Sequence, residues 1–342
     1  MQAIALRKVL SDMGHQATFI DYWPAYHRHM YAFFSFHRMM THKRLRGKIS
    51  YLKYFIVSFE CRKKRKNNIE SFIREFIEPY TSSMDDDFDV IVHGSDQIWR
   101  KQPEINTYNP IYFGKHLIKS KRKVSYAASM GILPDRESDK WKLKELLANL
   151  DVISVREHNL LELVGSLGYN EVRRDMDPTL LLTSEDWIKF LSLKKKESGE
   201  KYALYYRIKD SFDVGYLQRF TKSIGLKLRI VYNKAVGHET DTRIMTADPR
   251  QFLELIYNAD FIFTSSFHGL AFSLLFHKPF LASFTNNAER AASLLATLNL
   301  SDRLVSPKVE ISTQMSEIDY NRVDSELSLM RESSINSLKT IC

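Results

Sequence analysis

The chain is poor in cysteine and contains no long uninterrupted apolar run. Two of its 342 residues are cysteines, Cys61 and Cys342, so the sequence suggests neither a disulfide framework nor a cysteine-based metal site. Serine, histidine or lysine interrupts the longest apolar stretches well before the roughly 20 residues that a membrane-spanning helix needs. Arg7 and Lys8 come too early for a secretory signal peptide with an apolar centre. We therefore expect a cytoplasmic protein.

The sequence also lacks the common short motifs of nucleotide-dependent and metal-dependent enzymes. It contains no glycine-rich dinucleotide fingerprint, no phosphate loop, no HExxH, no GxSxG and no His/Cys metal spacing, so we expect no metal site. Hydrophobic residues make up 44% of the chain, which is enough to build real cores. A length of 342 residues is typical of about two domains.

Positive charge is concentrated in one segment. The formal net charge is +9, and residues 27–66 hold twelve Lys or Arg, four His and a single acid, Glu60. Basic residues interleaved with Tyr and Phe could bind nucleic acid, an anionic membrane surface or an acidic substrate. The same pattern fits a solvated helical face with an apolar back, and the sequence leaves these alternatives open.

Apolar strands alternate with amphipathic helices along most of the chain, which predicts an α/β fold with parallel sheets covered on both faces. The charged, glycine-bearing end of residues 184–200 is the best candidate for a connection between two such units. We therefore expect four parts: an N-terminal Rossmann-like domain over 1–183 with the basic aromatic segment as an insertion, a linker over 184–200, a C-terminal Rossmann-like domain over 201–310, and a helical tail over 311–342 that packs back on the first domain.

The start of the chain has a helical rhythm, with apolar residues at Ile4, Leu6, Val9 and Leu10, followed by a strand-like stretch over 16–22. A βαβ unit begins with a strand, so this order predicts that the first strand of the N-terminal domain is missing ahead of the helix.

The stretch "TSSFHGLAFSLLF", residues 264–276, follows an apolar strand and begins a helix. The carboxyl ends of parallel strands and the N-termini of the following helices are where α/β sheets bind anionic ligands. We expect His268 to lie there as a proton donor or acceptor, with four neighbours binding substrate: Ser265, Ser266, Phe267 and Gly269. The alternative is a histidine that caps the helix or bonds a buried carbonyl.

Residues 94–97 also follow an apolar strand, so the same argument predicts that they lie where a ligand binds. Gly94, Ser95, Asp96 and Gln97 supply backbone and side-chain hydrogen-bond partners for a substrate. A tight structural turn explains the glycine and serine equally well.

Two arginines, Arg156 and Arg207, lie at the carboxyl ends of predicted strands, where a ligand could bind. Arg156 could hold a carboxylate or phosphate with its planar guanidinium, although Glu157 could instead make it a structural ion pair. Arg207 is a similar but weaker candidate for substrate binding. Asp177 and Pro178 are interpreted as structural residues that fix a turn.

An ordered set of blocks resembles the polysaccharide pyruvyl transferase family. The blocks are "GSDQIW", "KVSYAASMG", "ISVRE", "DPTLLL", "NADFIFTSSFHGLAFSLLFHKPF" and "RAASLLATLNLSDR". Known members of that family transfer the pyruvyl group of phosphoenolpyruvate to two hydroxyls of a sugar, giving a cyclic ketal, on two Rossmann-like domains that face each other across a cleft as in GT-B glycosyltransferases. The resemblance therefore implies a transferase of polysaccharide biosynthesis that needs no redox cofactor.

The resemblance also implies roles for individual residues. His268 matches the histidine that is the leading candidate for the general acid, and Arg156 matches an arginine that clamps the anionic donor. Many relatives have Arg-Leu-His where this chain has Ser266, Phe267 and His268, so an arginine that contacts the donor is absent. Backbone N–H groups or Arg207 are the expected replacements.

The resemblance gives the basic segment over 27–66 a role as well. Acceptors in such pathways are often lipid-linked oligosaccharides, so a peripheral contact with the inner membrane face is expected, and nucleic acid is not an expected partner. Two other functions remain alternatives. One is a GT-B-type glycosyltransferase that uses a nucleotide-sugar donor, and the other is a non-catalytic protein that binds anionic surfaces.

Overall fold

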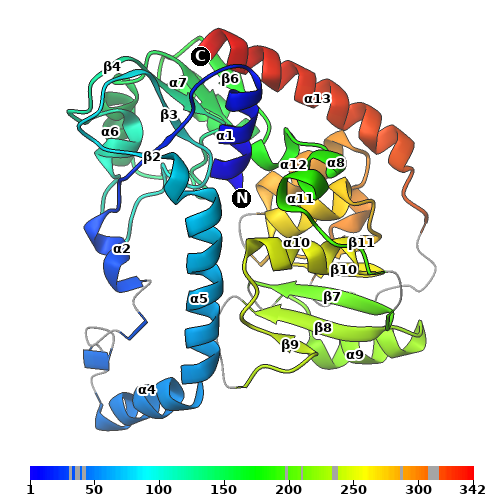
Figure 1. The fold of residues 1–342 in the computed structure, drawn as a ribbon. Coiled ribbons are helices and arrows are strands. Elements are labelled where there is room, and N and C mark those ends of the chain that lie inside the picture. The colour runs from blue at the N-terminus through cyan, green and yellow to red at the C-terminus, as the bar shows by residue number, and fades with distance from the viewer. Residues whose placement is uncertain are drawn as a thin grey trace.

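The computed structural model describes residues 1–30, 33–34, 39–40, 44–196, 199–208, 211–232, 238–285, 288–306 and 316–342 (Figure 1). Parts of three predicted segments, 27–66, 184–200 and 311–342, lie outside these residues. Within the described residues the chain forms a mixed α/β fold with twelve α-helices, and every pair of adjacent strands is parallel. None of the described helices combines the length and the apolar character that crossing a bilayer requires.

The second half of the chain builds a five-stranded parallel sheet in the order β11-β10-β7-β8-β9. Its strands are β7 (Tyr202–Arg207), β8 (Lys227–Tyr232), β9 (Arg243–Ile244), β10 (Phe261–Thr264) and β11 (Phe280–Ala282). Alternate residues of β7 point to opposite faces of the sheet. Ala203 and Tyr205 belong to the core that contains helix α9 (Val214–Ser223). Leu204 belongs to the core that contains helices α10 (Pro249–Tyr257) and α11 (Phe267–Leu275). Helices therefore cover both faces, which is why the strands are apolar on both sides.

The first half contains shorter parallel pairs. They are β1 (Phe19–Ile20) with β2 (Thr81–Ser82), β3 (Phe88–Gly94) with β4 (Ser120–Tyr126), and β5 (Ile153–Val155) with β6 (Val172–Arg174). Bridges from Val124 to Val152 and from Ala128 to Val155 join β4 to β5. A cavity of about 330 Å³ lies between β3, β1 and helix α1 (Gln2–Asp12). That a further strand belongs ahead of α1 stays a prediction.

The described chain contains eight further α-helices. They are α2 (Ala25–Met30), α4 (Leu45–Val57), α5 (Phe59–Phe76), α6 (Glu137–Leu147), α7 (His158–Ser166), α8 (Ser184–Leu191), α12 (Glu289–Thr297) and α13 (Tyr320–Ile341), with short 3-10 turns η1 (Glu78–Tyr80), η2 (Pro110–Phe113), η3 (Pro178–Leu180) and η4 (Ser301–Arg303). Of these helices, α4 projects away from the strands (Figure 1).

One hydrophobic core joins the two halves. It runs from α1 and α5 through η3 and α8 to α10, α11 and α13. Trp187 of α8 is fully buried at its centre, where its indole N–H donates to the Thr179 carbonyl at 2.9 Å and its ring lies edge-on to Phe272. The first part of the predicted linker is therefore a core helix, started by a capping box between Thr183 and Asp186.

Helix α13 crosses from the five-stranded sheet to the first half of the chain (Figure 1). Near its start, the Tyr320 hydroxyl donates to the Lys278 carbonyl at 2.6 Å. Farther along, the Ser334 hydroxyl accepts from the Met176 N–H at 3.0 Å and the Ser337 hydroxyl donates to the Asp175 carboxylate at 3.0 Å. These bonds fix the segment that follows β6, which carries Asp177.

Candidate active site

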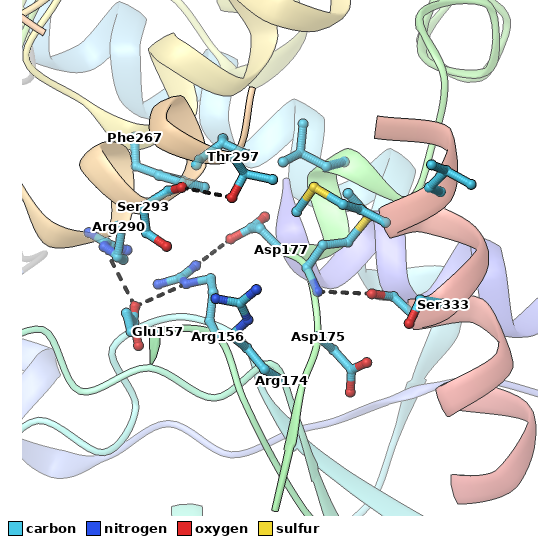
Figure 2. A pocket seen from close by; sticks show the side chains of 16 residues that line it. Arg156, Glu157, Arg174, Asp175, Asp177, Phe267, Arg290, Ser293, Thr297 and Ser333 are labelled. Atoms are coloured by element: carbon cyan, nitrogen blue, oxygen red, sulfur yellow. Dashed lines mark hydrogen bonds and ion pairs between the residues drawn. The ribbon is translucent and has the colours of Figure 1, made fainter. Parts of the chain in front are cut away.

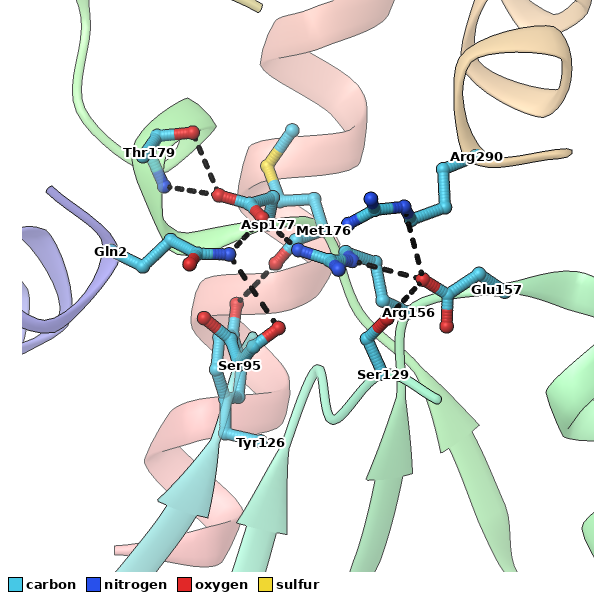
Figure 3. A network of polar contacts seen from close by, with 10 residues as sticks. All are labelled: Gln2, Ser95, Tyr126, Ser129, Arg156, Glu157, Met176, Asp177, Thr179 and Arg290. Atoms are coloured by element: carbon cyan, nitrogen blue, oxygen red, sulfur yellow. Dashed lines mark hydrogen bonds and ion pairs between the residues drawn. The ribbon is translucent and has the colours of Figure 1, made fainter. Parts of the chain in front are cut away.

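Arg156 is the centre of a buried polar network at the carboxyl end of β5 (Figure 3). Its side chain is only 4% exposed. Nη1 donates to the Asp177 carboxylate, and Nε donates to Glu157 Oε1 at 3.2 Å. Nη2 is buried and has no hydrogen-bond partner within the described part of the chain. Arg156 thus makes the ion pair with Glu157 that the sequence left open, and it still keeps N–H groups for a ligand.

Asp177 holds Arg156 in place. One carboxylate oxygen accepts from the Thr179 N–H at 3.0 Å and hydroxyl at 2.7 Å, and the other accepts from Arg156 and from Gln2 Nε2 at 2.6 Å. Burial alone would raise its pKa, but Arg156, His268 and the Thr179 hydrogen bonds outweigh burial and lower the pKa to about 2. The turn predicted at Asp177 exists, and the same side chain also positions Arg156, a role that the sequence analysis missed.

A second arginine, Arg290 at the start of α12, lies beside Arg156 (Figure 2). Its Nε is 3.7 Å from Glu157 Oε1 and is buried without a hydrogen-bond partner among the described residues. Burial and the nearby Arg156 charge lower the pKa of Arg290. Two guanidinium groups that share Glu157 and retain unpaired N–H groups form a cluster that favours an incoming anion.

Phe267 lies near both arginines (Figure 2). The guanidinium carbons of Arg156 and Arg290 are each 5.4 Å from the centre of its ring, within the range of cation–π contacts. Phe267 is the first residue of α11, so the arginines from β5 and α12 meet at the N-terminus of this helix. The predicted substrate-binding residue Phe267 thus contacts both cations directly.

His268 follows Phe267 in the first turn of α11 and is half-buried. Its Nε2 is buried and has no hydrogen-bond partner among the described residues, so this nitrogen is not engaged in capping or in a bond to a carbonyl. Burial lowers the pKa of His268, while the charges of Asp177 and Asp96 act in the opposite direction. Its charge state will therefore respond to a ligand anion bound nearby.

The residues around His268 hold the strand-to-helix turn. A Cβ on Gly269 would come within 2.2 Å of the Thr264 hydroxyl, so only glycine fits there. The Ser265 hydroxyl accepts from the Ile208 N–H at 3.0 Å, and the Ser266 N–H donates to the Thr264 hydroxyl at 3.0 Å. These contacts explain Ser265 and Gly269 structurally, and substrate binding by Ser265, Ser266 and Gly269 stays a prediction.

The loop at 94–97 approaches the same network through Gln2. Gln2 Nε2 donates to Asp177 and, at 3.5 Å, to the Ser95 carbonyl, while the Ser95 hydroxyl is buried without a partner in the described chain (Figure 3). A Cβ on Gly94 would come within 2.1 Å of the Tyr126 carbonyl, which gives this glycine a packing role. Asp96 is exposed.

No contact with Arg156 or Arg290 is among the described contacts of Gln97 and Arg207. The Gln97 side chain packs against Gly131, since a Cβ on that glycine would come within 2.8 Å of the Gln97 side-chain amide. Arg207 donates to the Tyr232 hydroxyl at 3.4 Å and lines a separate cavity of about 510 Å³ together with Ser211. The arginine beside Arg156 is Arg290, and substrate binding by Gln97 and Arg207 stays a prediction.

A pocket of about 330 Å³ opens beside the arginine pair, between the ends of β5 and β6 and helices α12 and α13 (Figure 2). Its charged and hydroxyl-bearing lining contains three arginines, three carboxylates and four hydroxyl side chains: Arg156, Arg174, Arg290, Glu157, Asp175, Asp177, Ser293, Thr297, Ser333 and Ser334. This lining offers both donors and acceptors of hydrogen bonds to a polar ligand. In the described residues, no three His, Cys, Asp or Glu side chains gather as a metal site would require.

A pocket lined by charged and hydroxyl side chains at the carboxyl ends of parallel strands is a candidate active site of an α/β enzyme. The comparison with protein families narrows this to a transferase. The family model of polysaccharide pyruvyl transferases matches residues 1–287, and the chain belongs to that family. The family acts in polysaccharide biosynthesis, as the sequence resemblance implied. Comparison with curated proteins gives no match.

Proposed function

We propose that the protein transfers the pyruvyl group of phosphoenolpyruvate to two hydroxyls of a sugar, forming a cyclic ketal. The acceptor would be a surface polysaccharide or its lipid-linked precursor. The observation that carries the donor assignment is the pair Arg156 and Arg290, both buried, both beside Phe267 and both with N–H groups left unpaired. A donor with a carboxylate and a phosphate can accept hydrogen bonds from the guanidinium N–H groups that Glu157 and Asp177 leave unpaired.

In this proposal His268 is the general acid. It gives a proton to the methylene carbon of phosphoenolpyruvate, and positive charge develops at the neighbouring carbon, which one sugar hydroxyl attacks. Inorganic phosphate then leaves this tetrahedral carbon, and the second hydroxyl attacks the resulting oxocarbenium ion and closes the ketal ring. One of the two hydroxyl protons returns to the histidine and the other goes to the departing phosphate. Atoms and electrons balance without a redox cofactor. The donor's charges raise the pKa that burial of His268 lowers, so donor binding itself charges the acid.

Asp177 and Glu157 act by positioning. Each accepts a hydrogen bond from Arg156, and Glu157 also accepts from the Ser129 hydroxyl at 2.6 Å. These carboxylates orient the guanidinium before the donor arrives, which lowers the entropic cost of binding.

The arrangement of the two sets of parallel strands supports a GT-B-like fold for this enzyme. Arg156 follows β5 in one half of the chain, and it contacts Phe267, the residue before His268, at the start of α11 in the other half. We place the reaction on the cytoplasmic side of a membrane, where a lipid-linked acceptor would be presented.

The test is a thermal-shift titration with phosphoenolpyruvate and a panel of nucleotide sugars. For the wild type, phosphoenolpyruvate at 100 times its Kd is expected to stabilise the fold by about 2.7 kcal/mol. The variant Arg290→Met should lose most of this stabilisation, and Arg156→Lys should lose the part that depends on a planar guanidinium. Arg219→Met, at an exposed site on α9, is the matched control and should behave as wild type.

Product analysis separates the two candidate reactions. Phosphate release that depends on a sugar acceptor and is lost in His268→Gln would support pyruvyl transfer. Stabilisation by a nucleotide sugar but not by phosphoenolpyruvate would instead make the protein a glycosyltransferase and remove the proton-donor role of His268.

A further inference from the structure

Helix α4 projects from the body of the protein at the end of α5 that is remote from the strands of the first half (Figure 1). None of its side chains is buried. Helix α4 leads directly into α5, and hydrogen bonds hold α5 to the segment that follows β9 of the five-stranded sheet. Arg65 donates to the Met245 carbonyl at 3.2 Å, and Asn68 donates to the Thr246 carbonyl at 2.9 Å.

Four large apolar side chains of α4 form a stripe that faces solvent. Leu45, Ile49, Leu52 and Ile56 follow the spacing that places side chains on one helical face, and they are 72%, 46%, 46% and 65% exposed. A different face of the helix is partnered, since the Phe55 ring lies 5.5 Å from the Phe33 ring and 5.0 Å from that of Phe34. The stripe is thus the side of α4 that the described chain leaves uncovered.

Positive charge borders this stripe. At 100° per residue, Lys48 and Lys53 project on opposite sides of it, and Arg44 and Arg46 add charge at the helix start. The sequence contains no Asp or Glu from residue 27 to residue 59. An apolar stripe between cations is the pattern of a helix that lies in a membrane interface, where the stripe contacts acyl chains and the lysines reach the lipid phosphates.

We propose that α4 docks the enzyme on an anionic lipid bilayer, with Leu45, Ile49, Leu52 and Ile56 inserted at the level of the headgroups and upper acyl chains. Nucleic acid would satisfy the cations but would leave the four apolar side chains in water, so a bilayer fits both features and nucleic acid fits only one. The inference concerns binding alone, and it stands whether or not the donor is phosphoenolpyruvate.

The test is flotation of the full chain with vesicles of phosphatidylcholine alone or with added phosphatidylglycerol. We expect binding to the anionic vesicles only, and weaker binding as salt is raised. Lys48→Gln with Lys53→Gln should reduce the partition coefficient about 30-fold, from the attraction of each cation to an anionic surface. Leu52→Asp with Ile56→Asp should reduce it by at least about tenfold, through the lost apolar burial.

The matched control is Leu117→Asp with Ile132→Asp, two apolar side chains exposed elsewhere on the surface. This variant should bind vesicles as the wild type does. All variants should keep the wild-type melting temperature, because none of the substituted side chains is buried. The variant Leu52→Trp adds a fluorescent side chain to the stripe, and brominated lipid should quench that added fluorescence.

Three results would overturn the proposal. They are a wild type that fails to float with anionic vesicles at low salt, flotation of the double variant Leu52→Asp with Ile56→Asp equal to that of the wild type, and tight binding to a single-stranded RNA with no vesicle binding. The last result would assign the surface to nucleic acid instead.

Discussion

Replacing Asp177 by asparagine removes one negative charge from the buried network and keeps the size of the side chain. The variant leaves Arg156 with Glu157 as its remaining carboxylate partner. The amide can still accept from Thr179, so the turn at η3 should survive. The effect should therefore report the loss of charge pairing with Arg156 rather than a general loss of structure.

The pKa of Asp177 sets the expected size of the effect. It is about 2 in the folded protein, against an ordinary value of 3.8, and this difference corresponds to about 2.4 kcal/mol of stability at neutral pH. Because the folded-state pKa is depressed, the contribution is complete above about pH 5 and is lost as pH falls through 2. At pH 3 it should have fallen to about 1.3 kcal/mol.

Urea unfolding of wild type and Asp177→Asn at pH 7 and pH 3, followed by circular dichroism, measures this directly. Asp177→Asn should cost about 2 to 3 kcal/mol at pH 7 and about half as much at pH 3. Asp89→Asn is the control, since Asp89 pairs with Lys121 on an exposed surface where solvent screens the pair, so its loss should leave the free energy of unfolding nearly unchanged. Equal destabilisation at both pH values would refute the assignment of the effect to the ionised carboxylate.

Three further predictions address the turn, the acid and the core. Gly269→Ala should destabilise the fold by about 1 to 3 kcal/mol, because the new methyl group meets Thr264, and a thermal melt without the expected loss would contradict this packing. If His268 is the general acid, kcat/KM should fall as pH rises through a pKa below 6.5, because burial lowers the pKa of the histidine in the free enzyme. The fall in kcat should come at a higher pH, because the bound donor raises that pKa. A His268→Gln variant whose activity still falls over the same pH range would remove the role. Trp99→Phe should cost about 2 kcal/mol in urea unfolding, since the buried indole fills the core and donates to the Tyr112 carbonyl at 3.0 Å, and wild-type stability would show that the core relaxes around the smaller ring.

The sequence was informative wherever the relevant pattern is local. The apolar runs of β7 and β10 and the helices that follow them predicted a parallel sheet with covered faces, and the structure has one. The strand-to-helix turn before His268 lies within a few residues, so its position at the start of α11 followed from the sequence as well.

Features that depend on tertiary packing were not predictable in this way. Arg290 belongs to a helix whose sequence shows only an ordinary apolar rhythm, and nothing local connects it with Arg156. The one indirect signal was the missing arginine before His268, which implied that backbone N–H groups or another arginine would have to contact the donor in its place. Asp177 was recognised as a turn residue because one of its oxygens does fix a turn, but the partners of its second oxygen, Arg156 and Gln2, come from distant parts of the chain.

Helix α13 joins the two halves of the chain beside the pocket. Its hydrogen bonds to Lys278 at one end and to Met176 and Asp175 farther along tie the two halves of the chain together across the pocket. A hinged enzyme can select its substrate by closing over it, but these ties oppose any such rotation. With the proposed function, substitutions on α12 and α13 at the rim of the pocket are expected to alter acceptor preference without altering the chemistry of the donor.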